Sequence, residues 1–194
     1  MMRHRFRYGP LVFRDPLLLC GTLYVLLYFD ASGFLRLGLL AAFLHEWGHI
    51  GAYLALFGQF PVIEITLTGF CMRTRGREMT LWQTALLAAA GPAVNFVLAG
   101  LWMLRLEQRG TIRASAFLAA NLLTGAFNLL PIPPLDGSKV LAAFLPDRQY
   151  ITLMRYERYG IVVLLVLSFV GIGSSLISRG ILGIYSALLS LIFG

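Results

Sequence analysis

The most constraining feature of the sequence is an apolar stretch of membrane-spanning length, residues 37–57, that carries three ionisable side chains. They are His45, Glu46 and His49, in the pattern H-E-x-x-H. On a helix, residues four apart project from one face, so both histidines can bind one metal ion while Glu46 handles the proton of a water molecule. Ionisable groups are costly inside a membrane and mark function there. The first hypothesis is therefore a zinc hydrolase site within a membrane.

The composition independently predicts a polytopic membrane protein. Hydrophobic residues make up 58% of the chain and charged residues 13%, against about 25% charged in soluble domains. The net charge of +7 does not indicate nucleic-acid binding, because the basic residues are scattered between apolar segments rather than gathered on one face. Cys20 and Cys71 form no metal-binding or redox motif, and we expect both to be inert.

The apolar segments predict an all-α polytopic fold with about six transmembrane helices. They lie at about 16–29, 34–57, 81–104, 114–130, 159–177 and 181–193. A span needs about 20 residues, which the last segment does not reach. We expect the first segment to be retained, because no small-residue cleavage site follows its basic flank. If all six segments cross, eleven Lys and Arg residues lie on one side and five on the other. This predicts two cytoplasmic termini.

A strand is predicted between the second and third spans. Residues 60–70 alternate apolar and polar positions around Ile65 and Leu67, bounded by Pro61 and Gly69. Two interpretations remain open. The segment is either an ordinary cytoplasmic hairpin or an edge strand that pairs with an extended substrate.

A third metal ligand is expected, because catalytic zinc usually has three protein ligands and a water molecule. Asp136 is the carboxylate that follows a broken apolar segment on the predicted cytoplasmic side, where Pro131, Pro133 and Pro134 preclude a regular helix. Such a break is tolerated at membrane depth where it lines a cavity or is buried in protein. The alternative is that Asp136 only caps the helix that begins near Gly137.

A second polar cluster lies within the third span. Pro92 is expected to weaken this helix and to free a backbone carbonyl. Asn95 follows three residues later, and on its own it could simply bond to a neighbouring helix.

Together these motifs resemble the site-2 protease family of intramembrane zinc metalloproteases. The likeness rests on H-E-x-x-H at His45, G-P-x-x-N ending at Asn95, and N-x-x-P from Asn128 leading to L-D-G around Asp136. It covers about residues 34–137, and the flanking helices match the six-helix layout of the sporulation-type branch. Ser138 stands where many relatives have a second glycine.

The resemblance implies a role for each matching residue. One Zn²⁺ per chain would be bound by His45, His49 and Asp136, with Glu46 as general base. Asn95 and Asn128 would hold the substrate strand or the oxyanion. Presentation of the substrate would fall to a membrane-associated strand region that includes Ile65, Leu67 and Gly69.

The expected protein is thus a single transmembrane protease domain, residues 1–194, in a bacterial cytoplasmic membrane. Its catalytic core is expected at 34–137 and its flanking helices at 16–29, 159–177 and 181–193. Its substrate would be a single-span or signal-peptide-like membrane protein, cut by regulated intramembrane proteolysis. No PDZ or nucleotide-sensing domain is visible, so control would come from substrate supply, a regulatory membrane protein or a prior cut. The alternatives are a metal-binding membrane transporter and an inactive protease-like scaffold.

Overall fold

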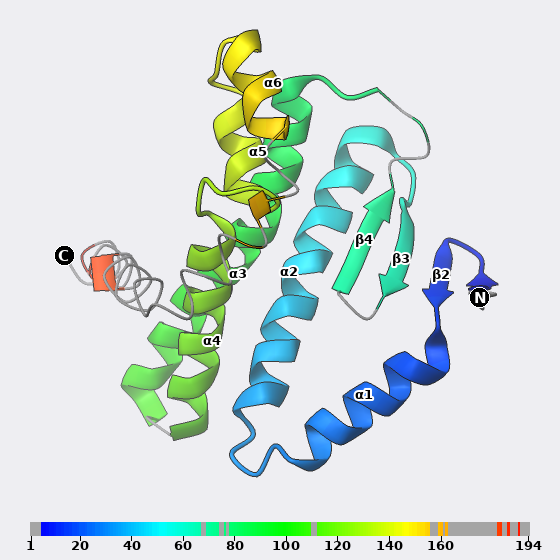
Figure 1. The fold of residues 1–194 in the computed structure, drawn as a ribbon. Helices are drawn as coiled ribbons and strands as arrows, with labels where there is room; N and C mark the ends of the chain where they lie inside the picture. The colour runs from blue at the N-terminus through cyan, green and yellow to red at the C-terminus, as the bar shows by residue number, and fades with distance from the viewer. Residues whose placement is uncertain are drawn as a thin grey trace.

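The computed structural model describes residues 5–66, 69–73, 76, 78–109, 112–155, 159–160, 162, 182–183, 186 and 190. In this part of the chain the elements follow one another in this order (Figure 1): β1 (Arg5–Tyr8), β2 (Leu11–Arg14), α1 (Pro16–Tyr28), α2 (Phe34–Phe57), β3 (Val62–Thr66), β4 (Gly69–Arg73), α3 (Leu81–Arg109), α4 (Ile112–Asn128), α5 (Asp136–Ala142) and α6 (Asp147–Arg155). The helices predicted at 159–177 and 181–193 lie almost entirely outside the described residues.

Helices α2, α3 and α4 pack against one another, and α5 lies against α3. Small side chains line these contacts, among them the buried Ala41, Ala85 and Ala88. Small residues let helix backbones approach closely, which favours helix packing in a membrane. At Gly48 of α2, an added Cβ atom would lie 2.5 Å from the carbonyl oxygen of Ala90 in α3. The two helices therefore touch at the level of the H-E-x-x-H motif.

Helix α3 runs unbroken through Pro92. A reciprocal capping box starts it, because the amide of Gln83 donates to Oγ1 of Thr80 and the amide of Thr80 donates to Oε1 of Gln83. The expected weakening at Pro92 does not end the helix. Pro92 is fully buried within the helical core, where a helix tolerates the hydrogen bond that proline cannot donate.

Among the described helices, one contains a stretch long and apolar enough to cross a membrane, Leu81–Leu104 of α3. Helix α1 is apolar but shorter, and it buries none of its residues. Helix α2 has 24 residues, but Arg36 and the polar residues of the motif lie within it. The mostly helical architecture is as predicted, whereas six spans and two cytoplasmic termini stay predictions.

A four-stranded sheet lies beside α2, with strand order β1-β2-β3-β4. The pairs β1–β2 and β3–β4 are antiparallel, and β2 runs parallel to β3, with Leu11 opposite Ile63. The β-structure predicted near residues 60–72 is present as the β3–β4 hairpin. The sheet is larger than predicted, because the basic N-terminal segment also forms two strands around a turn at Gly9.

Of the two interpretations of the predicted strand, the edge strand does not apply to the segment around Ile65. Ile65 lies on β3, which pairs with Phe13 of β2 on one side and with Phe70 of β4 on the other. The backbone of Ile65 is therefore already paired, and β4, which begins at Gly69, is the edge strand on this side of the described sheet. Leu67 lies outside the described residues.

The proline-rich segment between α4 and α5 is non-helical, as predicted. It returns the chain to the helical core, where Gly137 is so close to the carbonyl of Leu129 that a Cβ atom would clash with it. Helix α5 then starts at Asp136. Its N-cap residue is Leu135, without a side-chain cap, so Asp136 does not serve as the cap considered above.

Candidate metal centre

The two histidines of the motif project from one face of α2, one helical turn apart. Both are buried, with 4% of His45 and 8% of His49 exposed. Their Nε2 atoms lie 3.1 Å apart. The helical spacing read from the sequence thus brings two ligand atoms to one point.

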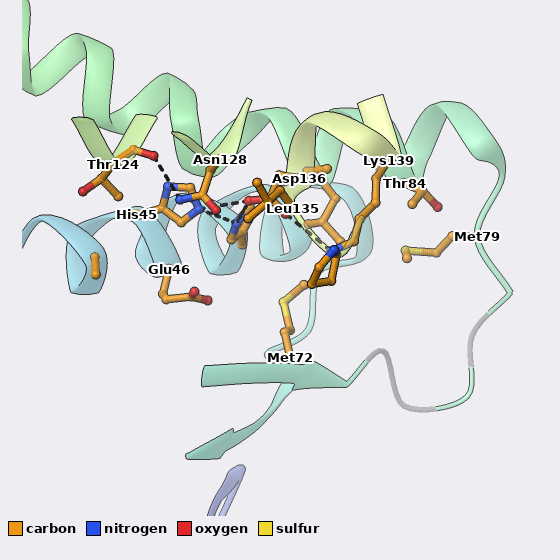
Figure 2. Close-up of a pocket in the computed structure, with 15 residues that line it drawn as sticks. His45, Glu46, Met72, Met79, Thr84, Thr124, Asn128, Leu135, Asp136 and Lys139 are labelled. Atoms are coloured by element: carbon orange, nitrogen blue, oxygen red, sulfur yellow. Dashed lines mark hydrogen bonds and ion pairs between the residues drawn. The ribbon is translucent and has the colours of Figure 1, made fainter. Parts of the chain in front are cut away.

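Asp136 reaches the same point from the start of α5 (Figure 2). Its Oδ2 atom lies 3.0 Å from Nε2 of His45 and 3.1 Å from Nε2 of His49. The three atoms therefore form a nearly equilateral triangle. His45, His49 and Asp136 are the group within the described residues whose side chains could together hold a metal ion.

The other ring nitrogen of each histidine is engaged on the far side of the ring. Nδ1 of His49 lies 2.7 Å from the carbonyl oxygen of Leu87, which can only accept, so this Nδ1 carries the proton. Nδ1 of His45 lies 2.7 Å from Oδ1 of Asn95 and donates to it in the same way. Both Nε2 atoms therefore direct a lone pair toward Oδ2 of Asp136.

Such a triangle needs a cation. Two imidazole lone pairs and a carboxylate oxygen converge within about 3 Å, in a buried place where their mutual repulsion is weakly screened. A positive ion between them turns this repulsion into attraction. The donor set of two nitrogens and one carboxylate oxygen is one that Zn²⁺ accepts.

Gly91 of α3 keeps the space beside the triangle free. A Cβ atom at this position would lie 2.5 Å from Nε2 of His49 and 2.6 Å from Nε2 of His45. Any larger residue would push the histidines out of place. The glycine of the G-P-x-x-N cluster thus has a steric role that its sequence context alone did not reveal.

A cavity of about 520 Å³ opens on the other side of the triangle. Its lining includes Glu46, Met72, Asn128 and Lys139. Figure 2 shows Glu46 projecting from α2 toward the side of the cavity where Met72 rises from β4. The cavity thus lies between the metal ligands and β4.

Lys139 approaches the second carboxylate oxygen of Asp136. Its Nζ lies 3.4 Å from Oδ1, one turn along α5. Oδ2 faces the histidines while Oδ1 faces Lys139, so the two oxygens of the carboxylate have separate partners. Lys139 is one of the eleven basic residues that the charge count assigns to the cytoplasmic side. Its i, i+3 spacing from Asp136 was a further signal that the two side chains could meet.

The two asparagines singled out in the sequence occupy different places. Asn128 lines the cavity, and its Nδ2 donates to the carbonyl of Thr124. Asn95 is fully buried behind His45 and is not among the cavity-lining residues. Behind Asn95 lies Asn121, also fully buried, which the sequence reasoning missed. Its signal was an amide in the middle of the apolar segment 114–130, one of two amides there together with Asn128.

Comparisons with known proteins bear on the fold of the chain and on the names of its relatives. No family model matches the chain. The "Putative zinc metalloprotease YwhC" of Bacillus subtilis is 33% identical over 103 residues, which are 46% of this chain and 47% of that protein. The "Putative zinc metalloprotease sll0528" of Synechocystis sp. is 32% identical over 146 residues, which are 69% of this chain and 36% of that protein.

A solved structure shows the same fold. The site-2 protease from Methanocaldococcus jannaschii superposes with a TM-score of 0.61, covering 97% of this chain and 94% of that one, at 20% identity. The chain therefore has the fold of a site-2 protease, and its curated relatives are named as putative zinc metalloproteases. The chain spans about half the length of YwhC and about a third of that of sll0528.

Proposed function

We propose that this protein is an intramembrane zinc endopeptidase, which binds one Zn²⁺ through His45, His49 and Asp136 and uses Glu46 as its general base. The observation that carries the proposal is the buried triangle of Nε2, Nε2 and Oδ2 with Glu46 on the adjoining cavity. The site-2 protease fold and the names of the curated relatives support the same chemistry.

The dimensions of the triangle suit zinc. Bonds of about 2.0–2.2 Å in a tetrahedral site place neighbouring ligand atoms about 3.3–3.6 Å apart. The three distances here are 3.0, 3.1 and 3.1 Å, so the ligands need to separate by only a few tenths of an ångström. His45, His49 and Asp136 all line the cavity, so a metal held by them would be accessible to water and substrate, as a catalytic site requires.

Bound zinc would lower the pKa of a water molecule and polarise the scissile carbonyl. The remaining steps fall to the side chains of the protein. Glu46 takes the proton from the attacking water and passes it to the leaving amine. Asn128, on the wall of the cavity, is placed to donate a hydrogen bond to the carbonyl oxygen as negative charge develops on it.

The substrate we propose is a transmembrane segment of another membrane protein, unwound near the cut, because a helical peptide bond is shielded by its own hydrogen bonds. The outer edge of β4, which has no strand beside it among the described residues, would pair with the unwound strand, since β3 is already paired on both sides. Met72 of β4 lines the cavity and would contact a substrate side chain. Residence in the bilayer as a multi-pass protein, and cleavage as part of regulated intramembrane proteolysis, belong to this proposal.

The test is zinc content and cleavage, measured on wild type and Glu46→Gln purified in detergent. Both should contain close to one zinc per chain, and only the wild type should cut members of a panel of single-span substrates. Zinc in both with cleavage in neither, and zinc flux across proteoliposomes, would favour a transporter. A chain that neither binds zinc nor cuts would be a scaffold and would contradict the proposal.

A further inference from the structure

Two buried amides connect His45 to helix α4. Asn95 of α3 contacts His45, and Asn121 of α4 contacts Asn95. Both amides are fully buried, with 0% of either residue exposed. Buried amides are costly unless their donors and acceptors are satisfied, so the hydrogen bonds of this pair determine how each amide is oriented.

The orientation of Asn95 follows from its donors. Its Nδ2 has two hydrogens, which go to the carbonyl of Ala41 at 3.1 Å and to Oδ1 of Asn121 at 3.0 Å. If the amide were flipped, its oxygen would face these two acceptors and lose both bonds. Asn95 must therefore present its oxygen to His45, and Nδ1 of His45 must carry the proton.

The orientation of Asn121 is determined one step further away. Its Nδ2 donates to the carbonyl of Phe117 at 2.9 Å, which turns its Oδ1 toward Asn95. Phe117 and Ala41 contribute backbone carbonyls, which cannot become donors. The bonds therefore run in one consistent direction, from Nδ1 of His45 through the two amides to the backbone acceptors.

We propose that Asn121 is a positioning residue for the metal centre, which acts through Asn95 to hold His45 in the Nδ1–H tautomer with its Nε2 lone pair free. The inference extends the proposed function to a residue on a third helix that touches neither metal nor substrate. His49 needs no such relay, because its Nδ1 donates directly to the carbonyl of Leu87. Loss of Asn121 should therefore affect His45 and leave the tautomer of His49 unchanged.

The test compares three substitutions in α4. Asn121→Leu has similar size but no acceptor for Asn95. Asn121→Asp keeps an oxygen in that place. Leu122→Ala, at a neighbouring residue that is 2% exposed, is the matched control for loosened packing. The full chain is labelled with ¹⁵N-histidine, and two-bond ¹H–¹⁵N correlation spectra distinguish Nδ1–H from Nε2–H in the metal-free protein.

The chain has only three histidines, so substitution of His4 leaves only the two of the site to be told apart. We expect the Nδ1–H form of His45 in wild type, Asn121→Asp and Leu122→Ala. Asn121→Leu should populate the Nε2–H form and weaken zinc binding about tenfold, measured by chelator competition. Asn121→Ala should behave like Asn121→Leu, and it replaces that variant if the leucine prevents folding.

A wild-type tautomer in Asn121→Leu and Asn121→Ala would overturn the proposal, even with zinc binding and cleavage intact. A shift of His45 to the Nε2–H form in Leu122→Ala would also overturn the proposal, because any disturbance of α4 would then be sufficient to change the tautomer. A wild-type chain without zinc would instead contradict the proposed function. The metal-free spectra would still test the role of Asn121, so the two failures are distinguishable.

Discussion

The two sides of the candidate site are built differently. On the buried side, the ligands are backed by Gly91, Asn95 and Asn121, and each asparagine is completely enclosed. On the open side, Glu46, Met72, Asn128 and Lys139 face a cavity of about 520 Å³. The buried side holds the ligand atoms in a single arrangement, because buried amides and close backbone contacts leave few alternatives. The open side has room for a substrate.

This difference teaches that metal binding and turnover depend on separate groups of side chains. Variants of the buried side should lose zinc, and activity as a result. Variants of the open side should keep zinc and lose activity alone. The following changes test that division, beginning with the largest expected effect.

Asp136→Ala removes one corner of the ligand triangle. We expect zinc to fall from about one per chain to near zero, because two histidines alone do not complete a catalytic site. Elemental analysis after gel filtration measures this. Asp30→Ala is the matched control, since Asp30 accepts the amides of Leu35 and Arg36 at the start of α2 and lies outside the site. Equal zinc in the Asp136 variant and its control would remove Asp136 from the ligand set.

Glu46→Gln keeps the shape of the open side but removes the base. Zinc should stay near one per chain, whereas the rate of substrate cleavage should fall by about 10²–10⁴-fold, the usual contribution of a positioned acid–base group. Single-turnover cleavage assays give the rate. Cleavage at the wild-type rate would rule out Glu46 as the base. Loss of zinc would mean that Glu46, on the open side, is needed for metal binding, and the division between the two sides would not hold.

Gly91→Ala inserts a methyl group between the histidines and α3. The nearest atoms would be 2.5 and 2.6 Å away, so the histidines must move. We expect about tenfold weaker zinc binding and about 10²-fold slower cleavage. Gly100→Ala is the control on the same helix, because nothing lies within 4 Å of a Cβ atom there. If Gly91→Ala and Gly100→Ala bind zinc equally well and cleave at the same rate, the close approach of α3 to the histidines at Gly91 does not matter for function.

Lys139→Met should have the smallest effect on the metal. The ammonium group lies 3.4 Å from Asp136 and its side chain is 42% exposed, so the screened pair contributes about 1 kcal/mol or less. Zinc affinity should weaken by no more than about fivefold, and Lys139→Arg should restore it. Chelator titrations at low and high salt measure this, and the difference should shrink with salt. A loss of zinc as large as that of Asp136→Ala would mean that Lys139 is required for metal binding, like the residues of the buried side.

Part of this site was readable because its signals are local. The spacing of His45 and His49 follows from the helical period, and Glu46 comes with the motif. Asp136 was a candidate because it follows the proline-broken segment. Asn121 and the steric role of Gly91 depend on how α3 and α4 meet α2, and no spacing within one helix specifies that contact.

The fold, like the site, was predictable from the sequence only where its signals are local. The β3 strand was predicted from its alternating residues, but its register was not. The parallel pairing of Leu11 with Ile63 joins residues more than fifty positions apart, and only the folded chain makes β3 an inner strand. Strands β1 and β2 were missed because arginines in the N-terminal segment were interpreted as topogenic. The alternation of Arg5, Phe6, Arg7 and Tyr8 was the signal for a strand there.

Zinc K-edge X-ray absorption of the wild-type chain tests the central claim most directly. The account predicts one zinc per chain with about four nitrogen or oxygen neighbours at about 2.0–2.2 Å, a signature of two imidazoles and no sulfur. The His45→Ala variant should lose its bound zinc, as Asp136→Ala does, because two ligands do not complete the site. A six-coordinate oxygen environment, a sulfur ligand or the absence of zinc would contradict the account.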